Sequence, residues 1–281
     1  MSSNLVAYHG QCTDGFTAAW CAWKKLNGHA EYVPIAYGTP FPDCNGKHVY
    51  MLDYCPHEES VIRRVASEAL SLTIIDHHGD KKSMLDAFDQ EGIPGLSVVF
   101  DEKHSGAWLA YRHFCPTEMI PAIVQYVEDQ DLDRWRLPLS KQYNAALQSF
   151  AFDFGEWDLA AYTPFSQMAS DGAVILRYKE RLVERAVAQA VEVEIDGYKV
   201  LAANTPLLMP EVATALAKDR PFGVAWMIRG DGLAQASLRS SGEVDVSKVA
   251  RKFNGGGHVR CAGYEWEWTA WPHGLPSSKS A

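Results

Sequence analysis

The sequence predicts an α/β fold with two domains: a larger α/β domain built on a parallel sheet and a smaller α+β domain, joined by a helical connector. In the first half, short apolar runs alternate with helical patterns, which is typical of a parallel sheet with crossover helices. A long amphipathic stretch follows, and beyond it paired apolar runs flank Asp-Gly turns, which indicate β-hairpins. We expect the first domain at 1–165, the connector at 166–190, the second domain at 191–272 and a flexible polar tail at 273–281.

Each expected element follows from the period of its apolar residues. In the first domain, runs of strand length predict strands at 4–8, 32–36, 48–53, 72–75 and 96–100. Helical periodicity predicts helices at 16–25, 59–70, 105–113, 121–128, 143–152 and 157–162, before the connector. In the second domain we expect hairpins at 191–203 and 223–238, a helix at 246–253 and a strand at 264–268.

The composition limits the classes of function. The chain has 281 residues, of which 47% are hydrophobic, so it can bury substantial cores. Its formal net charge of −9 argues against a protein that binds long nucleic acid by neutralising many phosphates. Short anionic substrates stay compatible with this charge, because a pocket in an acidic protein can be locally positive or lined by metal.

The cysteines and the N-terminal residues bear on the compartment. The six cysteines show neither C-x-x-C spacing nor a regular framework, so zinc ribbons and disulfide scaffolds find no support. The first residues lack the pattern of a secretory signal, and no stretch approaches the apolar length that spans a bilayer. We therefore expect a cytoplasmic protein with no membrane partner.

Polar residues follow several of the predicted strands. The carboxyl ends of parallel strands meet at one edge of a sheet, where open α/β sheets bind ligands, so these side chains are expected to converge. Imidazoles and carboxylates suit manganese, iron, zinc or magnesium, and two adjacent ions need a bridging carboxylate, for which Asp53 is the natural candidate. The candidate metal ligands are His9, Asp14, Asp53, His77 and Asp129.

Each candidate taken singly also has an ordinary structural explanation. His9 fits a turn, Asp14 a helix cap, Asp53 a strand-end turn and Asp129 a helix end. The tripeptide Asp76-His77-His78 alone fits a turn as well as a site. Their joint placement in one α/β half favours a site.

With these motifs in place, the sequence resembles the DHH phosphoesterase superfamily, named for the tripeptide that stands here at 76–78. The first motif appears as His9-Gly-Gln-Cys-Thr-Asp-Gly15, the second at Leu52-Asp53 and the fourth at Glu128-Asp129-Gln-Asp131. The second half resembles the associated nucleotide-binding domain through Leu238-Arg-Ser240 and Gly255-Gly-Gly-His-Val-Arg-Cys-Ala-Gly263. The resemblance thus covers nearly the whole chain.

The resemblance implies roles for the residues of the first, metal-binding domain. His9 and Asp53 would hold one metal, and Asp14, Asp53, His77 and Asp129 the other, with manganese the expected ion. The catalytic set is Asp53, Asp76, His77 and His78, in which His78 would face the substrate phosphate and Asp76 would orient the neighbouring imidazoles.

The second domain is implied to bind substrate. Arg239 and His258 would grip a terminal phosphate or the far end of a nucleotide, and glycines without Cβ atoms let backbone N–H groups approach an anion closely. The complete set expected there is Arg239, Ser240, Gly255, Gly256, Gly257, His258 and Arg260.

The first motif departs from the family pattern. Family members carry two aspartates there, and Cys12 stands at the first carboxylate position, with one extra residue after His9. Cys12 is either a thiolate ligand, which favours a softer metal, or a small buried hydrophobe. In the fourth motif, spacing does not separate Asp129 from Asp131.

Within the superfamily the chain is most similar to the oligoribonuclease, or nanoRNase, branch. This implies a metal-dependent phosphodiesterase that hydrolyses very short oligoribonucleotides or dinucleotides, for example linear pGpG, by metal-activated water. A pAp-type nucleotide phosphatase stays open, as does a nucleotide-binding regulatory protein weakened in catalysis by the missing aspartate. The expected partner is the short substrate, not long nucleic acid, and a homodimer stays open.

Overall fold

The computed structural model describes residues 3–36 and 38–268, and the chain divides into two compact units, Met1–Ile175 and Leu176–Ala281. The division falls inside the long helix α8 (Phe165–Val187), within the expected connector. The tail expected at 273–281 lies outside the described residues. In the described part of the chain, no helix combines the length and the apolar character that crossing a membrane requires.

The first unit is built on a five-stranded parallel sheet in the order β2-β1-β3-β4-β5. Strands at all five predicted places confirm the α/β class. Because β1 pairs with β2 on one side and β3 on the other, the order reverses between β1 and β3, and ligands bind at such switch points. The strands are β1 (Asn4–His9), β2 (Glu31–Ile35), β3 (His48–Leu52), β4 (Ser71–Asp76) and β5 (Leu96–Phe100).

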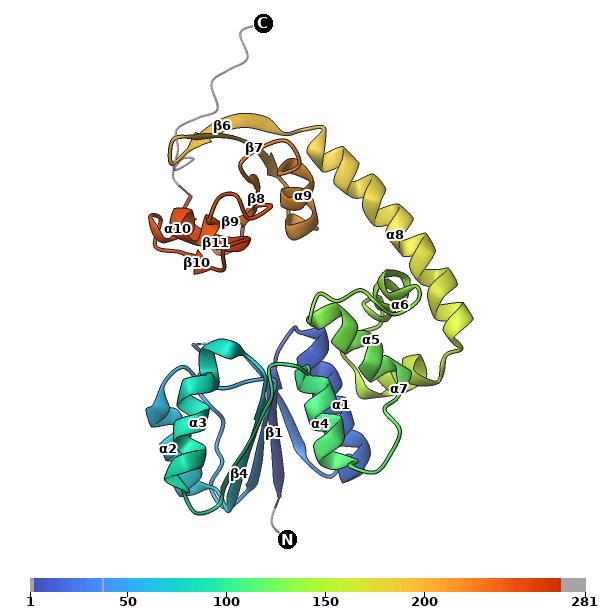
Figure 1. Cartoon of the computed structure of the whole chain (residues 1–281), viewed down its shortest axis with the longest axis vertical. Coiled ribbons are helices and arrows are strands. Elements are labelled where there is room, and N and C mark those ends of the chain that lie inside the picture. The colour runs from blue at the N-terminus through green and yellow to red at the C-terminus, as the bar shows by residue number, and fades with distance from the viewer. Residues whose placement is uncertain (1–2, 37, 269–281) are drawn as a thin grey trace, which may run out of the picture. The chain divides into compact units, whose positions relative to one another are not determined.

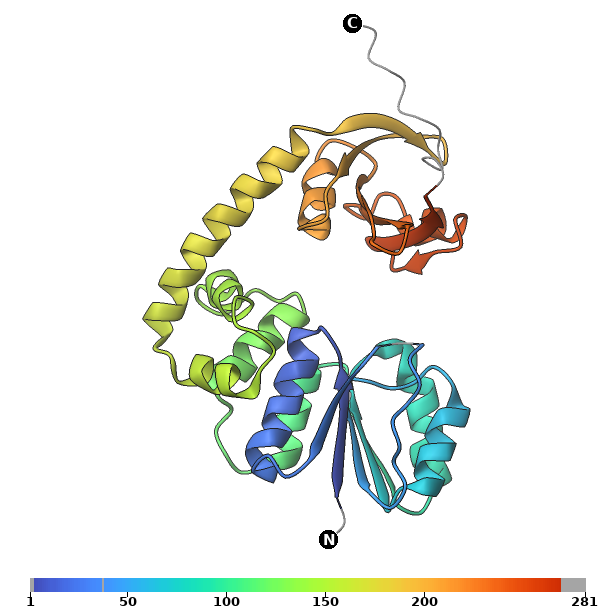
Figure 2. The ribbon, with the colours of Figure 1, turned by 180° about the vertical axis from the view of Figure 1, so that it is seen from behind.

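Helices cover both faces of this sheet, as Figure 1 shows, and Figure 2 shows the same layers from behind. On one face α2 (Glu59–Glu68) and α3 (Lys82–Glu91) enclose a core that contains Met51, Ile62 and Leu85. On the other face α1 (Thr13–Leu26) and α4 (Gly106–Phe114) belong to a larger core that contains Leu52, Ile75 and Trp157. Four more helices contribute to that core, namely α5 (Ala122–Asp131), α6 (Ser140–Leu147), α7 (Phe154–Tyr162) and, through Met168, α8.

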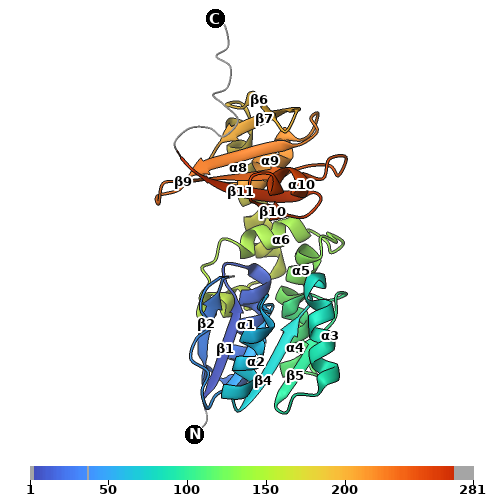
Figure 3. The ribbon, with the colours of Figure 1, turned by 90° about the vertical axis from the view of Figure 1, so that its left-hand side faces the viewer.

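The second unit contains a six-stranded mixed sheet, which confirms the α+β class expected there. The order is β10-β11-β9-β8-β7-β6, and all neighbours are antiparallel except β7 and β8. Figure 3 shows β9 and β11 beside α10. The strands are β6 (Val191–Ile195), β7 (Tyr198–Asn204), β8 (Gly223–Ile228), β9 (Leu233–Arg239), β10 (Gly256–Gly257) and β11 (Cys261–Glu267).

Helices pack on both faces of this second sheet. Alternate residues of a strand face opposite sides. Thus Val224 belongs to the core under α10 (Val246–Arg251), while Ala225 belongs to the core under α9 (Met209–Leu216) and the end of α8. The predicted hairpin turn between β6 and β7 is also present, with Asp196 and Gly197 both at positive φ as a tight turn requires.

Candidate metal centre

Three parallel strands bring the first candidate residues to one edge of the sheet. His9 ends β1, Asp53 follows β3 directly, and His77 follows β4 directly. Asp53 has a left-handed backbone with φ 53°, a conformation that aspartate tolerates, and its N–H donates to Ile75 O at 2.9 Å. The Asp53 carboxylate therefore lies at the switch point of the sheet, on a backbone whose conformation is fixed by a hydrogen bond.

The two oxygens of the Asp53 carboxylate face different histidines. Oδ2 lies 3.3 Å from His9 Nδ1, and Oδ1 lies 3.2 Å from His77 Nε2. Burial alone would raise the pKa of Asp53, but interactions with His77 and His9 and the nearby charge of His78 lower that pKa to about 2. Asp53 is therefore ionised across the physiological range, with one oxygen toward each imidazole.

A second group forms around the other side of His77. Its Nε2 lies 3.8 Å from Asp14 Oδ2 and 3.5 Å from Asp131 Oδ2. Asp14 Oδ1 accepts a hydrogen bond from the Ala107 N–H at 3.0 Å, whereas Oδ2 is buried with no hydrogen-bond donor among the described residues. A buried carboxylate oxygen without a donor is costly unless a cation or a proton satisfies it.

The crowding of acids shifts their pKa values. Burial, followed by the charges of Asp53 and Asp131, raises the pKa of Asp14 well above its ordinary value. Burial and the charge of Asp53 also raise the pKa of Asp131, to about 6. Burial would lower the pKa of His77, but Asp53 and then Asp14 raise it to about 9. Bound divalent cations would offset the same repulsion, so the cluster fits metal.

Among the residues that the structure describes, the potential ligand atoms form three overlapping groups, with all atoms of a group within 4.8 Å of one another. Asp53 belongs to the first two groups and His77 to the last two, so shared residues link them. Overlap of this kind suits two adjacent cations held by one bridging carboxylate. The groups are His9 with Cys12 and Asp53, Asp53 with His77 and His78, and Asp14 with His77 and Asp131.

Asp76 lies behind the two histidines and is fully buried. Its Oδ1 lies 2.7 Å from His78 Nδ1 and accepts hydrogen bonds from the backbone N–H groups of His77 and His78. This pairing raises the pKa of His78 despite its burial. Asp76 thus contacts the His78 ring directly and His77 through its backbone. The His78 side chain is 33% exposed, which leaves it accessible to a substrate.

Asp129 does not join the cluster, and this corrects the ligand expected there. Its Oδ1 accepts from the Arg136 N–H at 2.9 Å and its Oδ2 from the Leu137 N–H at 3.1 Å. Burial would raise the pKa of Asp129, but hydrogen bonds from Ser140 and from these N–H groups lower it. Residues two apart on a helix point to nearly opposite sides, so Asp131 instead of Asp129 reaches His77.

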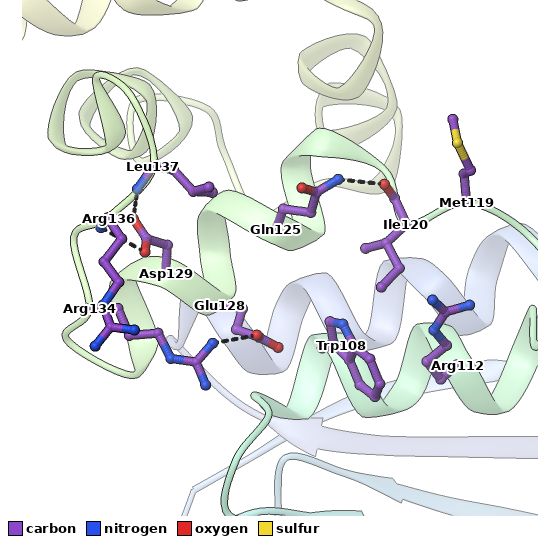
Figure 4. A pocket seen from close by; sticks show the side chains of 10 residues that line it. All are labelled: Trp108, Arg112, Met119, Ile120, Gln125, Glu128, Asp129, Arg134, Arg136 and Leu137. Carbon is purple, nitrogen blue, oxygen red and sulfur yellow. Dashed lines mark hydrogen bonds and ion pairs between the residues drawn. The ribbon is translucent and has the colours of Figure 1, made fainter.

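A cavity of about 580 Å³ lies between α4 and α5, on the side of α5 that carries Asp129; Figure 4 shows the residues that line it. Glu128 Oε1 accepts from Arg134 at 2.7 Å, and its Oε2 lies 3.1 Å from His104 Nδ1. The His104 ring stacks on Trp108 with centroids 3.5 Å apart. His104 therefore belongs to this ion-pair network and to none of the ligand groups found among the described residues.

Sequence reasoning missed two glycines whose lack of a side chain lets the cluster form. A Cβ on Gly15 would stand 2.4 Å from His9 O, and a Cβ on Gly106 would stand 2.6 Å from Asp53 Cβ. Gly15 was noted only as part of a motif. For Gly106 the only signal was its place after Ser105, a typical helix N-cap, whose side chain accepts from the Trp108 N–H.

In the second unit, the expected substrate-binding residues gather at one end of the β9–β11 ladder. Arg239 is the register partner of Cys261, and the Ser240 N–H donates to Arg260 O at 3.0 Å. The His258 N–H donates to Cys261 O at 2.7 Å, so residues 258–261 form a tight turn. The run of glycines precedes this turn, and two of its members pair with β11 as β10 instead of forming an open loop.

Comparisons with known proteins define the fold. No family model matches the chain. A pGpG-specific phosphodiesterase from Vibrio cholerae is 12% identical, with a TM-score of 0.55 over 95% of this chain and 94% of that one. An exopolyphosphatase-related protein from Bacteroides fragilis is 14% identical, with a TM-score of 0.52 over 96% and 88%. A DHH domain from a member of a family of ribosomal proteins is 13% identical, with a TM-score of 0.56 over 94% and 83%.

The chain therefore has the fold of DHH-domain proteins, which confirms the predicted resemblance at the level of the fold. A curated relative, an uncharacterized protein of Acanthamoeba polyphaga mimivirus, is 24% identical over 286 residues. That match covers 92% of this chain and 66% of the viral protein, so this chain spans about two thirds of that relative.

Proposed function

We propose that the protein is a metal-dependent phosphoesterase that hydrolyses very short oligoribonucleotides or dinucleotides. The observation that carries this proposal is the Asp53 carboxylate, whose two oxygens face His9 and His77 at 3.3 and 3.2 Å. A buried aspartate with an imidazole at each oxygen is the arrangement that a bridging ligand of two cations needs. A fold alone does not define an activity, so the proposal rests on this site.

The ligand groups support a separate role for each side chain. His9 and Asp53 would hold one divalent ion, and Asp14, Asp53, His77 and Asp131 the other, with manganese the first ion to test. When bound, such ions supply a nucleophilic water at neutral pH and neutralise charge that develops on phosphoryl oxygens. Asp53 would keep the two positions adjacent, since each of its oxygens already faces one ligand imidazole.

His78 is suited to hold the substrate phosphate. Asp76 holds a proton at His78 Nδ1, and this pairing raises the pKa of the ring, which favours the charged form. Nε2 can then donate to a non-bridging phosphate oxygen. A charged donor fixed by a buried carboxylate stabilises the anionic substrate and the additional charge of the transition state.

The second unit carries its own set of candidate anion-binding residues. The backbone places Arg239, Ser240, His258 and Arg260 at one end of the β9–β11 ladder, in a chain whose net charge is −9. Arginine side chains at one end of a sheet favour an anionic group such as a terminal phosphate. The Vibrio protein with this fold is described as pGpG-specific, so linear pGpG is the first substrate to test.

A reducing compartment such as the cytoplasm suits the proposal, because all six cysteines are free, including three that are buried. No specific observation favours a pAp phosphatase or a binding-only regulator over the phosphodiesterase. Both are therefore treated as outcomes of the experiment.

The experiment measures hydrolysis of linear pGpG, pAp, cyclic dinucleotides and longer RNA by metal-free protein supplied with manganese, cobalt, zinc or iron. Rapid turnover of pGpG is the expected result.

Asp53→Asn should reduce turnover roughly 100-fold or more, because the shared carboxylate is lost. Asp89→Asn, at an exposed position on α3, is the matched control and should leave turnover unchanged. Preferential turnover of pAp would replace the substrate class, and binding without turnover in all four metals would overturn the enzyme assignment.

A further inference from the structure

Cys12 is the one cysteine among the described residues that belongs to a potential ligand group. Its Sγ lies within 4.8 Å of ligand atoms of both His9 and Asp53. The buried cysteines Cys21 and Cys55 instead direct their sulfur atoms to backbone carbonyls, of Ala107 and Pro56, and both belong to the apolar cores. Cys12 belongs to none of these cores and is partly exposed, so a core-packing role does not account for it.

The local backbone presents the Cys12 sulfur to the cluster. Gln11 has a left-handed conformation with φ 56°, which is uncommon for a residue other than glycine or asparagine. Cys12 then returns to an extended conformation and forms the N-cap of α1, where its side chain makes no capping hydrogen bond. The extra residue after His9 is thus accommodated in the turn at Gln11. Burial and the charge of Asp53 raise the pKa of the Cys12 thiol, so the thiolate forms only when a bound cation offsets that charge.

A second observation in the same group points to a ligand. Asp53 is 1% exposed, and its Oδ1 has no aligned hydrogen-bond donor among the described residues, although His77 Nε2 is 3.2 Å away. A cation on the His77 side would satisfy Oδ1, and Oδ2 then faces a cation position beside His9 and Cys12. Carboxylate, imidazole and sulfur would then form a mixed ligand set at one position, whereas the group of Asp14, His77 and Asp131 offers only nitrogen and oxygen.

We propose that the Cys12 thiolate, together with His9 and Asp53, ligates the first metal, so that the two metal positions differ in chemistry. The position with sulfur selects a softer ion such as zinc, cobalt or iron(II), and the all-nitrogen-and-oxygen position suits manganese or magnesium. On binding, the thiol proton passes to solvent as the metal–sulfur bond forms. This inference deepens the proposed function but depends on it only for the presence of a divalent metal centre.

The test is an absorption titration of the full metal-free chain with cobalt(II). A thiolate ligand gives an intense sulfur-to-cobalt charge-transfer band in the near ultraviolet, and nitrogen and oxygen ligands do not. We expect this band in the wild type, its loss in Cys12→Ser and Cys12→Asp, and its retention in Cys115→Ser, which alters a cysteine outside every ligand group. A band that persists in both Cys12 variants, or a wild type that binds cobalt without the band, overturns the proposal.

A competition measurement tests the selectivity. Cys12→Asp should weaken zinc binding relative to manganese by about 10-fold or more, the scale on which ligand surroundings tune metal affinity. An unchanged zinc-to-manganese ratio would contradict a sulfur ligand. Neither readout needs turnover. If the band appears but no substrate is hydrolysed, Cys12 is a metal ligand and the proposed function is wrong. If substrate is hydrolysed but the band is absent, the proposed function stands and Cys12 is not a ligand.

Discussion

Gly106 packs so tightly against Asp53 that a Cβ at position 106 would stand 2.6 Å from Asp53 Cβ and 2.9 Å from Asp14 Oδ2. Gly106 is the first residue of α4, and the next residue, Ala107, donates its N–H to Asp14 Oδ1 at 3.0 Å. The N-terminus of α4 therefore supports both buried carboxylates, through contact with one and through a hydrogen bond and the helix dipole at the other.

This contact predicts that Gly106→Ala damages the metal centre. The added methyl group has no room beside the Asp53 side chain, so the carboxylates must move apart or the helix must shift. We expect a loss of stability of about 1–3 kcal/mol and manganese binding weakened by roughly 10-fold or more. Calorimetric titration and thermal unfolding measure the two effects. Gly230→Ala is the control, since nothing lies within 4 Å of its Cβ position; equal behaviour of the two variants would refute the contact.

The pair Asp129 and Asp131 predicts two different defects on one helix. Asp131→Asn should weaken metal binding with little effect on folding, because Asp131 Oδ2 faces His77 at 3.5 Å and its side chain is 24% exposed. Asp129→Ala should lower the free energy of unfolding by about 2–3 kcal/mol, since its carboxylate accepts two backbone N–H bonds in a buried site. Unfolding in denaturant and metal titration of both variants separate these outcomes, and a reversed pattern would restore Asp129 as the ligand.

The same pair shows where sequence reasoning reached its limit. The parallel strands were predictable because β-branched and apolar runs mark them, and parallel strands direct their carboxyl ends to one edge. On this basis, the sequence predicted that His9, Asp53 and His77 lie close together. Asp129 and Asp131 lie on a helix that crosses this edge. Which of the two side chains faces the cluster depends on how the helix packs and on the backbone N–H groups at 136–137, and the local sequence does not indicate either.

Close approaches between distant segments were also beyond the sequence. Glycine is needed at position 106 because Asp53, at the end of β3, lies directly beside the start of α4. The sequence of neither segment shows that the two lie so close together. Helix α3 was not predicted, although its apolar residues Met84, Leu85 and Phe88 have a helical spacing. Within the glycine run, Gly256 and Gly257 pair with β11 as the short strand β10, which was not predicted from the sequence.

The three consecutive glycines are predicted to differ in their tolerance of a side chain. A Cβ at Gly255 would stand 2.2 Å from Gly263 O, and one at Gly257 would stand 2.5 Å from Cys261 O, while nothing lies within 4 Å of Gly256. Gly257→Ala should therefore lower stability by about 2 kcal/mol, and Gly256→Ala should stay within about 0.5 kcal/mol of the wild type.

Denaturant unfolding measures these changes, and Gly256→Ala then allows a clean test of substrate binding. If the backbone at 256 approaches a phosphate, its methyl group should raise the KM for pGpG several-fold with little change in kcat. Unchanged kinetics would leave the glycines with a packing role only.

The raised pKa values predict how pH acts on the metal-free protein. The pKa of His77 is raised to about 9 in the folded chain, so the stability it contributes is full below its unfolded pKa and is lost as pH rises through about 9. The pKa of Asp131 is raised to about 6, so its ionisation also disfavours the folded state as pH rises to that value. Both groups make the metal-free chain less stable at higher pH.

Metal should reverse this trend, because divalent ions bind the deprotonated ligands. The increase in Tm that manganese produces over chelator should therefore grow as pH rises from about 6.5 to about 9. Thermal unfolding at several pH values, with manganese and with EDTA, measures it. His77→Gln should flatten the dependence, whereas His29→Gln, at an exposed position outside the cluster, should retain it. A manganese effect that is constant or shrinks with pH would show that proton release from this cluster does not accompany metal binding.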